Sequence, residues 1–153
     1  MTTSPDLDAR RLRARAALLF FLGLLTGIWV GVVFTEGRAL SFHLDFHPKF
    51  PRLALGAHLN ALLGCFWMIA VASTLERMAD GARKWVVRLT TLVAYANWFV
   101  TLIASMIDER GLAFDANPRN DLVAVLLMLG VVLPGLTAAG VWAWSLRKDL
   151  NAQ

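Results

Sequence analysis

Two groups of polar side chains lie inside stretches of sequence that are otherwise apolar. His58 and Asn60 are near the start of one stretch, and Tyr95, Asn97 and Thr101 are midway along another. A polar or ionisable side chain at membrane depth is costly, so each group is a functional hypothesis by default. Neutral imidazole is a common axial ligand of haem iron. A histidine hydrogen-bonded to a neighbouring helix is the structural alternative, and the residues alone leave both open.

The neighbours of these side chains also bear on their role. Asn97 and Thr101 are four residues apart and share a helix face, so they could line one cavity, whereas Tyr95 points to a different face. Asparagine also serves as a hydrogen-bonding contact between membrane helices. Small residues surround His58 and would admit another helix or a flat ligand; they are Ala54, Gly56, Ala57, Ala61 and Gly64.

Other chemistry has less support in the sequence. His43 and His47 flank Asp45 in a proline-containing segment, which is either a weak metal site or an ordinary solvated loop. The single cysteine, Cys65, excludes a disulfide framework or a cysteine cluster within one chain. There is no P-loop, G-x-S-x-G, H-E-x-x-H or C-x-x-C motif. The apolar stretches hold no Asp or Glu at depth, which argues against a proton-coupled transporter.

The elements that must position these residues are four apolar stretches. Each has about the 20 residues that a helix needs to cross a bilayer. The chain is 58% apolar and 17% charged, with a mean hydropathy of +0.57, which is typical of a membrane protein. The sequence therefore predicts an all-α, multi-pass integral membrane four-helix bundle over residues 16–146, with spans at 16–35, 53–74, 85–106 and 122–144. Pro134 predicts a kink in the fourth span.

Orientation follows from the lysines and arginines. Ten lie before the first span, between the second and third, or after the fourth, and five lie in the other two connections. The positive-inside rule places residues 1–15 and the tail 147–153 in the cytoplasm. We expect the protein in the cytoplasmic (inner) membrane. Although the pI is near 10, the basic residues sit at the ends of apolar runs, so no nucleic-acid partner is expected.

Three short motifs resemble one known family. They are Ala57-His58-Leu59, Tyr95-Ala96-Asn97-Trp98 and Arg110-Gly111-Leu112-Ala113-Phe114. They look like the small membrane isomerases, hydroxylaminobenzene mutase and styrene oxide isomerase, which are similar to each other. The similarity runs from about Leu53 to Trp144.

The resemblance implies an oligomer, a trimer in the epoxide isomerase, with haem b held between protomers. His58 falls on the family's iron ligand, and Asn97 on its cavity asparagine. Asn60 and Thr101 are weaker candidates for the same pocket, which His58 and Asn97 are expected to face together. Because the spans hold a single histidine, one iron position would stay open to substrate.

The resemblance also implies the reaction. It is a redox-neutral rearrangement of a small aromatic substrate, with ferric haem as a Lewis acid: an aryl hydroxylamine becomes a 2-aminophenol. The alternatives are isomerisation of an aryl epoxide to an aldehyde and a non-catalytic haem-binding or sensor protein. Gly64, Val93 and Thr101 depart from the epoxide isomerase pattern, which has asparagine, aspartate and tyrosine there. Asn60 stands where the mutases often have glutamate, so the motifs look closer to the mutase side.

Overall fold

The computed structural model describes residues 4–36 and 48–150, the side chains of 149 and 150 excepted, and these residues form helices without any strand. Four helical segments are long and apolar enough to cross a membrane, namely Pro5–Thr35, Arg52–Ala72, Asp80–Ile107 and Pro118–Lys148. The all-α fold with four spans, predicted from the sequence, is therefore confirmed. His43 and His47 lie outside the described residues.

Helix α1, Pro5–Thr35, begins well before the apolar run that it contains. The Ser4 hydroxyl accepts a hydrogen bond from the Leu7 amide at 3.3 Å, and Pro5 occupies the first helical turn. Asp6 and Asp8 add negative charge at the same end. These are favourable helix-start features, so residues 5–15, expected as a separate cytoplasmic segment, continue the membrane helix.

Helices α2 (Arg52–Ala72) and α3 (Asp80–Ile107) are joined by the short 3₁₀ helix η2, Leu75–Arg77. At the far end of α3, Asp108 adopts a left-handed conformation with φ 57°. Its carboxylate accepts hydrogen bonds from the amides of Lys49 (2.7 Å) and Phe50 (2.9 Å). Asp108 therefore ties the end of α3 to the start of α2.

The fourth span consists of α4 (Pro118–Leu127), a π-helical turn η3 (Met128–Val132) and α5 (Leu133–Leu150). In the π turn, the Leu133 amide donates to the Met128 carbonyl, five residues earlier. Pro134 has no amide hydrogen to donate, so the regular ladder is already interrupted here. The local disturbance expected at Pro134 thus takes the form of one wide turn directly before it.

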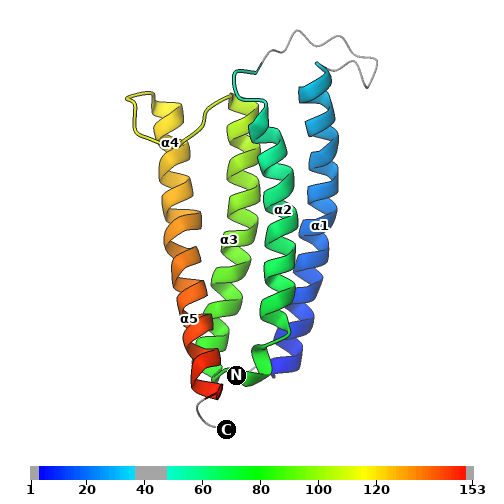
Figure 1. Ribbon diagram of the computed structural model, residues 1–153, viewed down its shortest axis with the longest axis vertical. Coiled ribbons are helices and arrows are strands. Elements are labelled where there is room, and N and C mark those ends of the chain that lie inside the picture. Colours follow the sequence, from blue (N-terminus) through cyan, green and yellow to red (C-terminus); the bar gives the residue numbers. More distant parts are fainter. Residues whose placement is uncertain (1–3, 37–47, 151–153) are drawn as a thin grey trace.

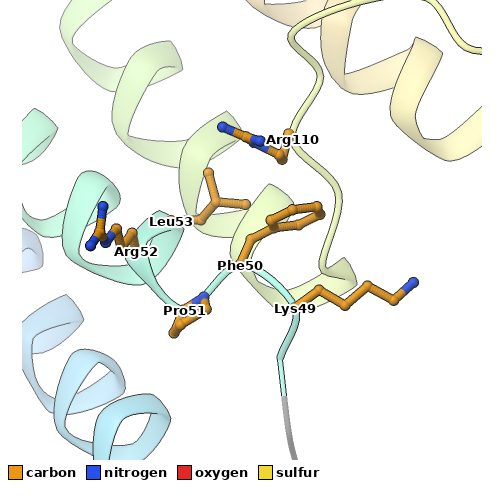
Figure 2. A pocket seen from close by; sticks show the side chains of 6 residues that line it. All are labelled: Lys49, Phe50, Pro51, Arg52, Leu53 and Arg110. Carbon is orange, nitrogen blue, oxygen red and sulfur yellow. The ribbon is translucent and has the colours of Figure 1, made fainter.

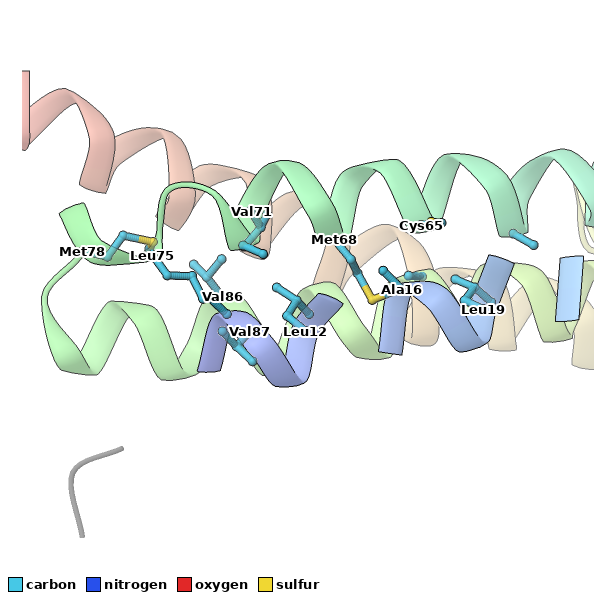
Figure 3. Packing of buried hydrophobic residues seen from close by; sticks show 14 residues of the cluster. Leu12, Ala16, Leu19, Cys65, Met68, Val71, Leu75, Met78, Val86 and Val87 are labelled. Atoms are coloured by element: carbon cyan, nitrogen blue, oxygen red, sulfur yellow. The ribbon is translucent and has the colours of Figure 1, made fainter. Parts of the chain in front are cut away.

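Successive spans run in opposite directions, and both chain ends lie at the same end of the bundle (Figure 1). Helix α3 packs against α1, α2 and α5, and so occupies the centre of the structure. The main core lies toward the end that holds the termini (Figure 3), where Leu12, Leu19 and Met68 are fully buried. Large apolar side chains such as Phe21, Phe66 and Leu136 are exposed on the outside, as a lipid-facing surface requires.

Candidate functional site

His58 projects from α2 toward α1, and one of its ring nitrogens is already engaged. Nδ1 lies 2.8 Å from the backbone carbonyl oxygen of Gly23. Because a carbonyl oxygen only accepts hydrogen bonds, Nδ1 must carry the proton and donate it. In the neutral ring, Nε2 then holds the lone pair. This is the arrangement that fixes the tautomer and orientation of histidines that ligate metals.

Two glycines of α1 make room for this ring. A Cβ at Gly23 would stand 2.8 Å from the Ala61 Cβ, which is too close for two atoms fixed to their backbones. A Cβ at Gly27 would touch the His58 ring, with Cε1 and Nδ1 both at 3.5 Å. The absence of a side chain at Gly23 lets α1 and α2 approach closely and brings the Gly23 carbonyl to the imidazole. A Cβ at Gly27 would make an ordinary van der Waals contact with the ring.

Asn60, Asn97 and Thr101 form a hydrogen-bonded triad between α2 and α3. The Asn60 amide nitrogen donates to Asn97 Oδ1 at 3.2 Å and to Thr101 Oγ1 at 3.0 Å. The Thr101 hydroxyl in turn donates to the Asn97 backbone oxygen at 2.6 Å. The structure therefore brings together the three polar residues that the sequence singled out beside His58.

The direction of these bonds decides what the triad can offer a ligand. Asn60 uses both of its N–H groups and keeps its Oδ1 acceptor, while Asn97 uses its Oδ1 and keeps its N–H donors. Within the described part of the chain, neither of these remaining groups has a hydrogen-bond partner. All three side chains are half-buried. The triad thus keeps neutral N–H donors on Asn97 and a neutral acceptor on Asn60.

His58 and the triad contact different neighbours within one protomer. The imidazole is bonded to α1, whereas Asn60 is bonded to α3, and no hydrogen bond joins the two groups among the described residues. Positions two apart on an α-helix point about 200° apart, which explains the separation. Within one protomer His58 and Asn97 are thus not joined by a hydrogen bond, and a cavity that both face stays a prediction.

Tyr95 and Glu109 form hydrogen bonds away from His58 and the triad. Tyr95 points away from Asn97, and its hydroxyl donates to the Arg15 carbonyl at 2.8 Å. Glu109, just after α3, accepts a hydrogen bond from the Asn117 side chain at 2.7 Å. Among the described residues, no group of three or more His, Cys, Asp or Glu side chains could hold a metal ion.

A pocket opens at the end of the bundle opposite the termini. It has a volume of about 310 Å³ and is lined by Lys49, Phe50, Pro51, Arg52, Leu53 and Arg110 (Figure 2). The Arg110 guanidinium lies over the Phe50 ring, 5.1 Å from its centroid. This cation–π contact closes one side of the pocket. The pocket contains neither His58 nor a member of the triad.

Two departures from the epoxide isomerase pattern occupy tightly packed positions. A Cβ at Gly64 would lie 3.0 Å from the Ala94 Cβ and 3.1 Å from the Leu19 Cδ2, so an asparagine has no room there. Val93 is buried, and its Cγ1 would be 3.6 Å from a Cβ at Gly135 on α5. Where the epoxide isomerase pattern has polar side chains, this chain therefore has apolar contacts between helices.

The residues that sequence reasoning missed are Gly23 and Gly27. Their signal is present in the sequence: Gly23, Gly27 and Gly31 recur every four residues in the first apolar stretch. Such spacing places small residues along one face and marks a close helix–helix contact. The pattern identifies a packing face, although it does not indicate that a histidine ring lies against it.

Comparison with known proteins gives two matches. The family model described as styrene oxide isomerase matches residues 8–148, which is most of the chain. A hydroxylaminobenzene mutase of Ectopseudomonas oleovorans is 31% identical over 106 residues, covering 66% of this chain. The chain spans 56% of the length of that relative. No solved structure matches.

Proposed function

The chain belongs to the styrene oxide isomerase family, and we propose that it is a membrane isomerase that converts an aryl hydroxylamine to a 2-aminophenol. The reaction is a redox-neutral intramolecular rearrangement, and the proposed cofactor is haem b. The similarity to a hydroxylaminobenzene mutase supports this substrate class. In this proposal the bundle lies in the cytoplasmic membrane with both termini in the cytoplasm, and an oligomer, proposed to be a trimer, completes the site.

The observation that carries the choice of substrate is the donor–acceptor pair of the triad. An aryl hydroxylamine has N–H and O–H donors and a hydroxyl oxygen that accepts, so it can satisfy both Asn97 Nδ2 and Asn60 Oδ1. An epoxide oxygen only accepts, and it would leave the Asn60 oxygen without a partner in an apolar site. Leaving such a group unpaired costs about 1–3 kcal/mol, which favours the hydroxylamine.

The residues around His58 fit a haem iron. Its Nδ1 proton is committed to the Gly23 carbonyl, so Nε2 is the nitrogen that would hold the iron. Gly27 leaves the ring edge uncrowded. When bound, ferric haem would supply a Lewis acid with one open position. Since His58 and the triad lie on different sides of α2, we propose that the triad of a neighbouring protomer faces the group that His58 holds.

The triad would orient the substrate and respond to its change in charge. Asn97 Nδ2 would donate to the substrate oxygen, where negative charge develops as the N–O bond weakens, and Asn60 Oδ1 would accept from the substrate N–H. A donor already in position costs no reorganisation during the reaction. The N–O bond breaks with its electron pair going to oxygen, and the same oxygen bonds to the ortho carbon. That carbon then loses its proton and the nitrogen gains one, so the ring regains aromaticity as 2-aminophenol with no net gain or loss of atoms or electrons. The apolar walls would keep bulk water from attacking the cationic ring.

The family model favours a second candidate, isomerisation of an aryl epoxide to an aldehyde. The same donor, Asn97, would then hold the epoxide oxygen. Three residues argue against this candidate. The epoxide isomerase pattern has asparagine, aspartate and tyrosine where this chain has Gly64, Val93 and Thr101. A non-catalytic haem-binding or sensor protein would share the histidine site but would convert neither substrate.

Side-by-side conversion of two substrates tests the proposal. Purified protein loaded with haem is incubated separately with hydroxylaminobenzene and with styrene oxide, and the products are identified by chromatography. We expect 2-aminophenol, with a higher kcat/KM than that for phenylacetaldehyde formation. Exclusive formation of the aldehyde would establish the second candidate, and conversion of neither substrate by haem-loaded protein would leave only a binding role.

A further inference from the structure

A shallow, open cleft between α1 and α3 lies near the end of the bundle that holds the termini. It has a volume of about 540 Å³ and is lined by Arg15, Leu18, Arg88, Thr91, Leu92 and Tyr95. Arg15 comes from α1 and Arg88 from α3, and both are exposed. The cleft shares no residue with His58 or the triad, so the proposed reaction does not use it.

The walls of the cleft hold its shape. The Arg15 Nη1 donates to the Thr91 hydroxyl at 3.3 Å, and the Tyr95 hydroxyl donates to the Arg15 backbone oxygen at 2.8 Å. Both bonds join α1 to α3. Two hydrogen bonds to α3 therefore fix the position of Arg15 on the cleft wall, and its backbone oxygen accepts one of them.

The charge in the cleft is not balanced within the described part of the chain. The nearby acids have other partners: Asp6 pairs with Arg10 at 2.9 Å, and Asp80 pairs with Arg83 at 2.9 Å. Arg83, which is 2% exposed, also contacts Asp8 at 3.2 Å. Among the described residues, neither Arg15 nor Arg88 has a carboxylate within ion-pair distance. Two cations at one opening attract an anionic partner.

The cleft changes from charged to apolar along its length. Leu18 follows Arg15 by three residues and Leu92 follows Arg88 by four, so each leucine lies one turn further along the same helix face. Both leucines are about half exposed, at 52% and 49%. A ligand that fits this gradient has a negative head near the arginines and an apolar tail along the leucines, which is the chemistry of an anionic phospholipid.

We propose that this cleft is a binding site for one anionic phospholipid, whose phosphate is held by Arg15 and Arg88 and whose acyl chain lies along Leu18 and Leu92. Basic pockets between membrane helices recognise anionic headgroups in this way. In the proposed orientation, Arg15 and Arg88 lie at the cytoplasmic leaflet, on the same side of the membrane as the termini. The bound lipid neutralises two cations at the membrane boundary and holds α1 against α3.

The first test uses the wild-type protein in a nonionic detergent. Thermal unfolding is followed while phosphatidylglycerol or phosphatidylcholine is added, and the number of bound lipids is counted by native mass spectrometry. We expect phosphatidylglycerol to raise the Tm and to bind with a stoichiometry of one per protomer, since a ligand of the folded state stabilises it. Equal effects of the two lipids would overturn the proposal.

The second test compares two double variants that lose the same charge. Arg15→Gln/Arg88→Gln removes the cations of the cleft, and we expect the affinity for phosphatidylglycerol to fall about 30-fold, at about 1 kcal/mol per cation. Arg13→Gln/Arg77→Gln removes two exposed cations outside the cleft and should leave the affinity unchanged. Equal loss in both variants would indicate attraction by net charge alone and would contradict the site.

Two further outcomes identify other occupants of the cleft. If millimolar inorganic phosphate displaces phosphatidylglycerol, the cleft binds a free anion and the acyl chain contributes nothing. If Arg15→Gln/Arg88→Gln dissociates the oligomer while lipid binding persists, the cleft is a contact with a second copy of the chain. Either result would overturn the proposal. Should the double variant fail to fold, the lipid selectivity of the wild-type Tm still decides the question.

Discussion

The hydrogen bond between His58 and the Gly23 carbonyl determines which ring nitrogen can bind a ligand. A histidine in the opposite tautomer would direct its proton toward the iron and could not coordinate it. The bond also restrains rotation of the ring, because its acceptor is a backbone atom of another helix. One contact therefore sets both the protonation pattern and the orientation of the proposed iron ligand.

Removal of the His58 imidazole should abolish haem binding and leave a space that free imidazole can fill. We expect the His58→Ala variant to purify without a Soret band and to regain one when imidazole and haem are added together. An absorption spectrum measures both steps. A Soret band of unchanged position and intensity in His58→Ala without imidazole would rule out His58 as the iron ligand.

Asn97 and Thr101 offer a matched pair of substitutions in the triad. Asn97→Leu removes the donor proposed to meet the substrate oxygen, and we expect kcat for 2-aminophenol formation to fall about 100-fold, as for other preorganised donors. Thr101→Val keeps the side-chain shape and loses two hydrogen bonds of the hydroxyl, one accepted from Asn60 on α2 and one donated to the Asn97 carbonyl on α3. We expect a loss of stability of about 0.6–1.7 kcal/mol, as for hydrogen bonds between membrane helices.

The two variants therefore separate orientation of the substrate from support of the helices. Steady-state kinetics and thermal unfolding are measured on both proteins, with haem content matched. If Asn97→Leu and Thr101→Val lose activity equally, in proportion to their loss of stability, Asn97 acts through helix packing and not through the substrate.

At the scale of the helices, the close approach of α1 to α2 is what delivers the Gly23 carbonyl to His58. In Gly23→Ala the new Cβ would lie 2.8 Å from the Ala61 Cβ, so the two helices must separate. We expect a loss of stability of about 1–3 kcal/mol, typical of overpacking, together with weaker haem retention. Thermal unfolding and the Soret absorbance measure the two effects.

Gly31→Ala is the control for this substitution. It lies on the same helix, and a Cβ there would have no other atom within 4 Å. We expect unchanged haem retention and equal or slightly higher helix stability, because alanine favours helices over glycine. If Gly31→Ala weakened haem retention as much as Gly23→Ala, the helix contact at Gly23 would not be responsible.

The spans could be predicted from sequence because length and apolar composition alone define a membrane helix. The sequence did not predict which neighbouring helix each face contacts. His58 and Asn60 are close in sequence, yet they contact α1 and α3 respectively. Which neighbour each meets depends on packing of small residues such as Gly23 and Gly64, and this requires knowledge of all three helices together.

Hydropathy also did not predict where the helices begin and end. Hydropathy begins the first span at Ala16, whereas the helix begins at Pro5 because Ser4 caps it. The segment after α3 is ordered by Asn120, whose side chain accepts from the Gly111 amide at 2.7 Å and donates to the Ala113 carbonyl at 2.6 Å. Capping and loop bonds of this kind join residues that no periodic pattern connects.

For the whole molecule, the distribution of lysine and arginine predicts both chain ends in the cytoplasm. Single cysteines test this orientation, since the native Cys65 is buried and gives little background. We expect Phe114→Cys to react with a membrane-impermeant maleimide in intact cells, and Ala79→Cys to react only after the membrane is permeabilised. Both positions are exposed; Ala79 directly precedes α3, and Phe114 lies in the connection between α3 and α4. The reverse labelling pattern would invert the proposed orientation.

The proposed site includes residues from more than one copy of the chain. The sequence singled out His58, Asn60, Asn97 and Thr101, and the structure joins the last three in one hydrogen-bonded triad. The proposed meeting of His58 with this triad requires a second protomer, and residues at such an interface carry no signature in a single sequence. The account therefore rests on an assembled, dry site in which the substrate rearranges without water.

The most direct test of that claim is the origin of the oxygen in the product. Haem-loaded protein is incubated with hydroxylaminobenzene in water enriched in oxygen-18, and the product is examined by mass spectrometry. The account predicts 2-aminophenol that carries the substrate's own oxygen and no label, because the hydroxyl moves within one molecule in a pocket closed to water. Incorporation of oxygen-18 into 2-aminophenol, or formation of no 2-aminophenol at all, would contradict it.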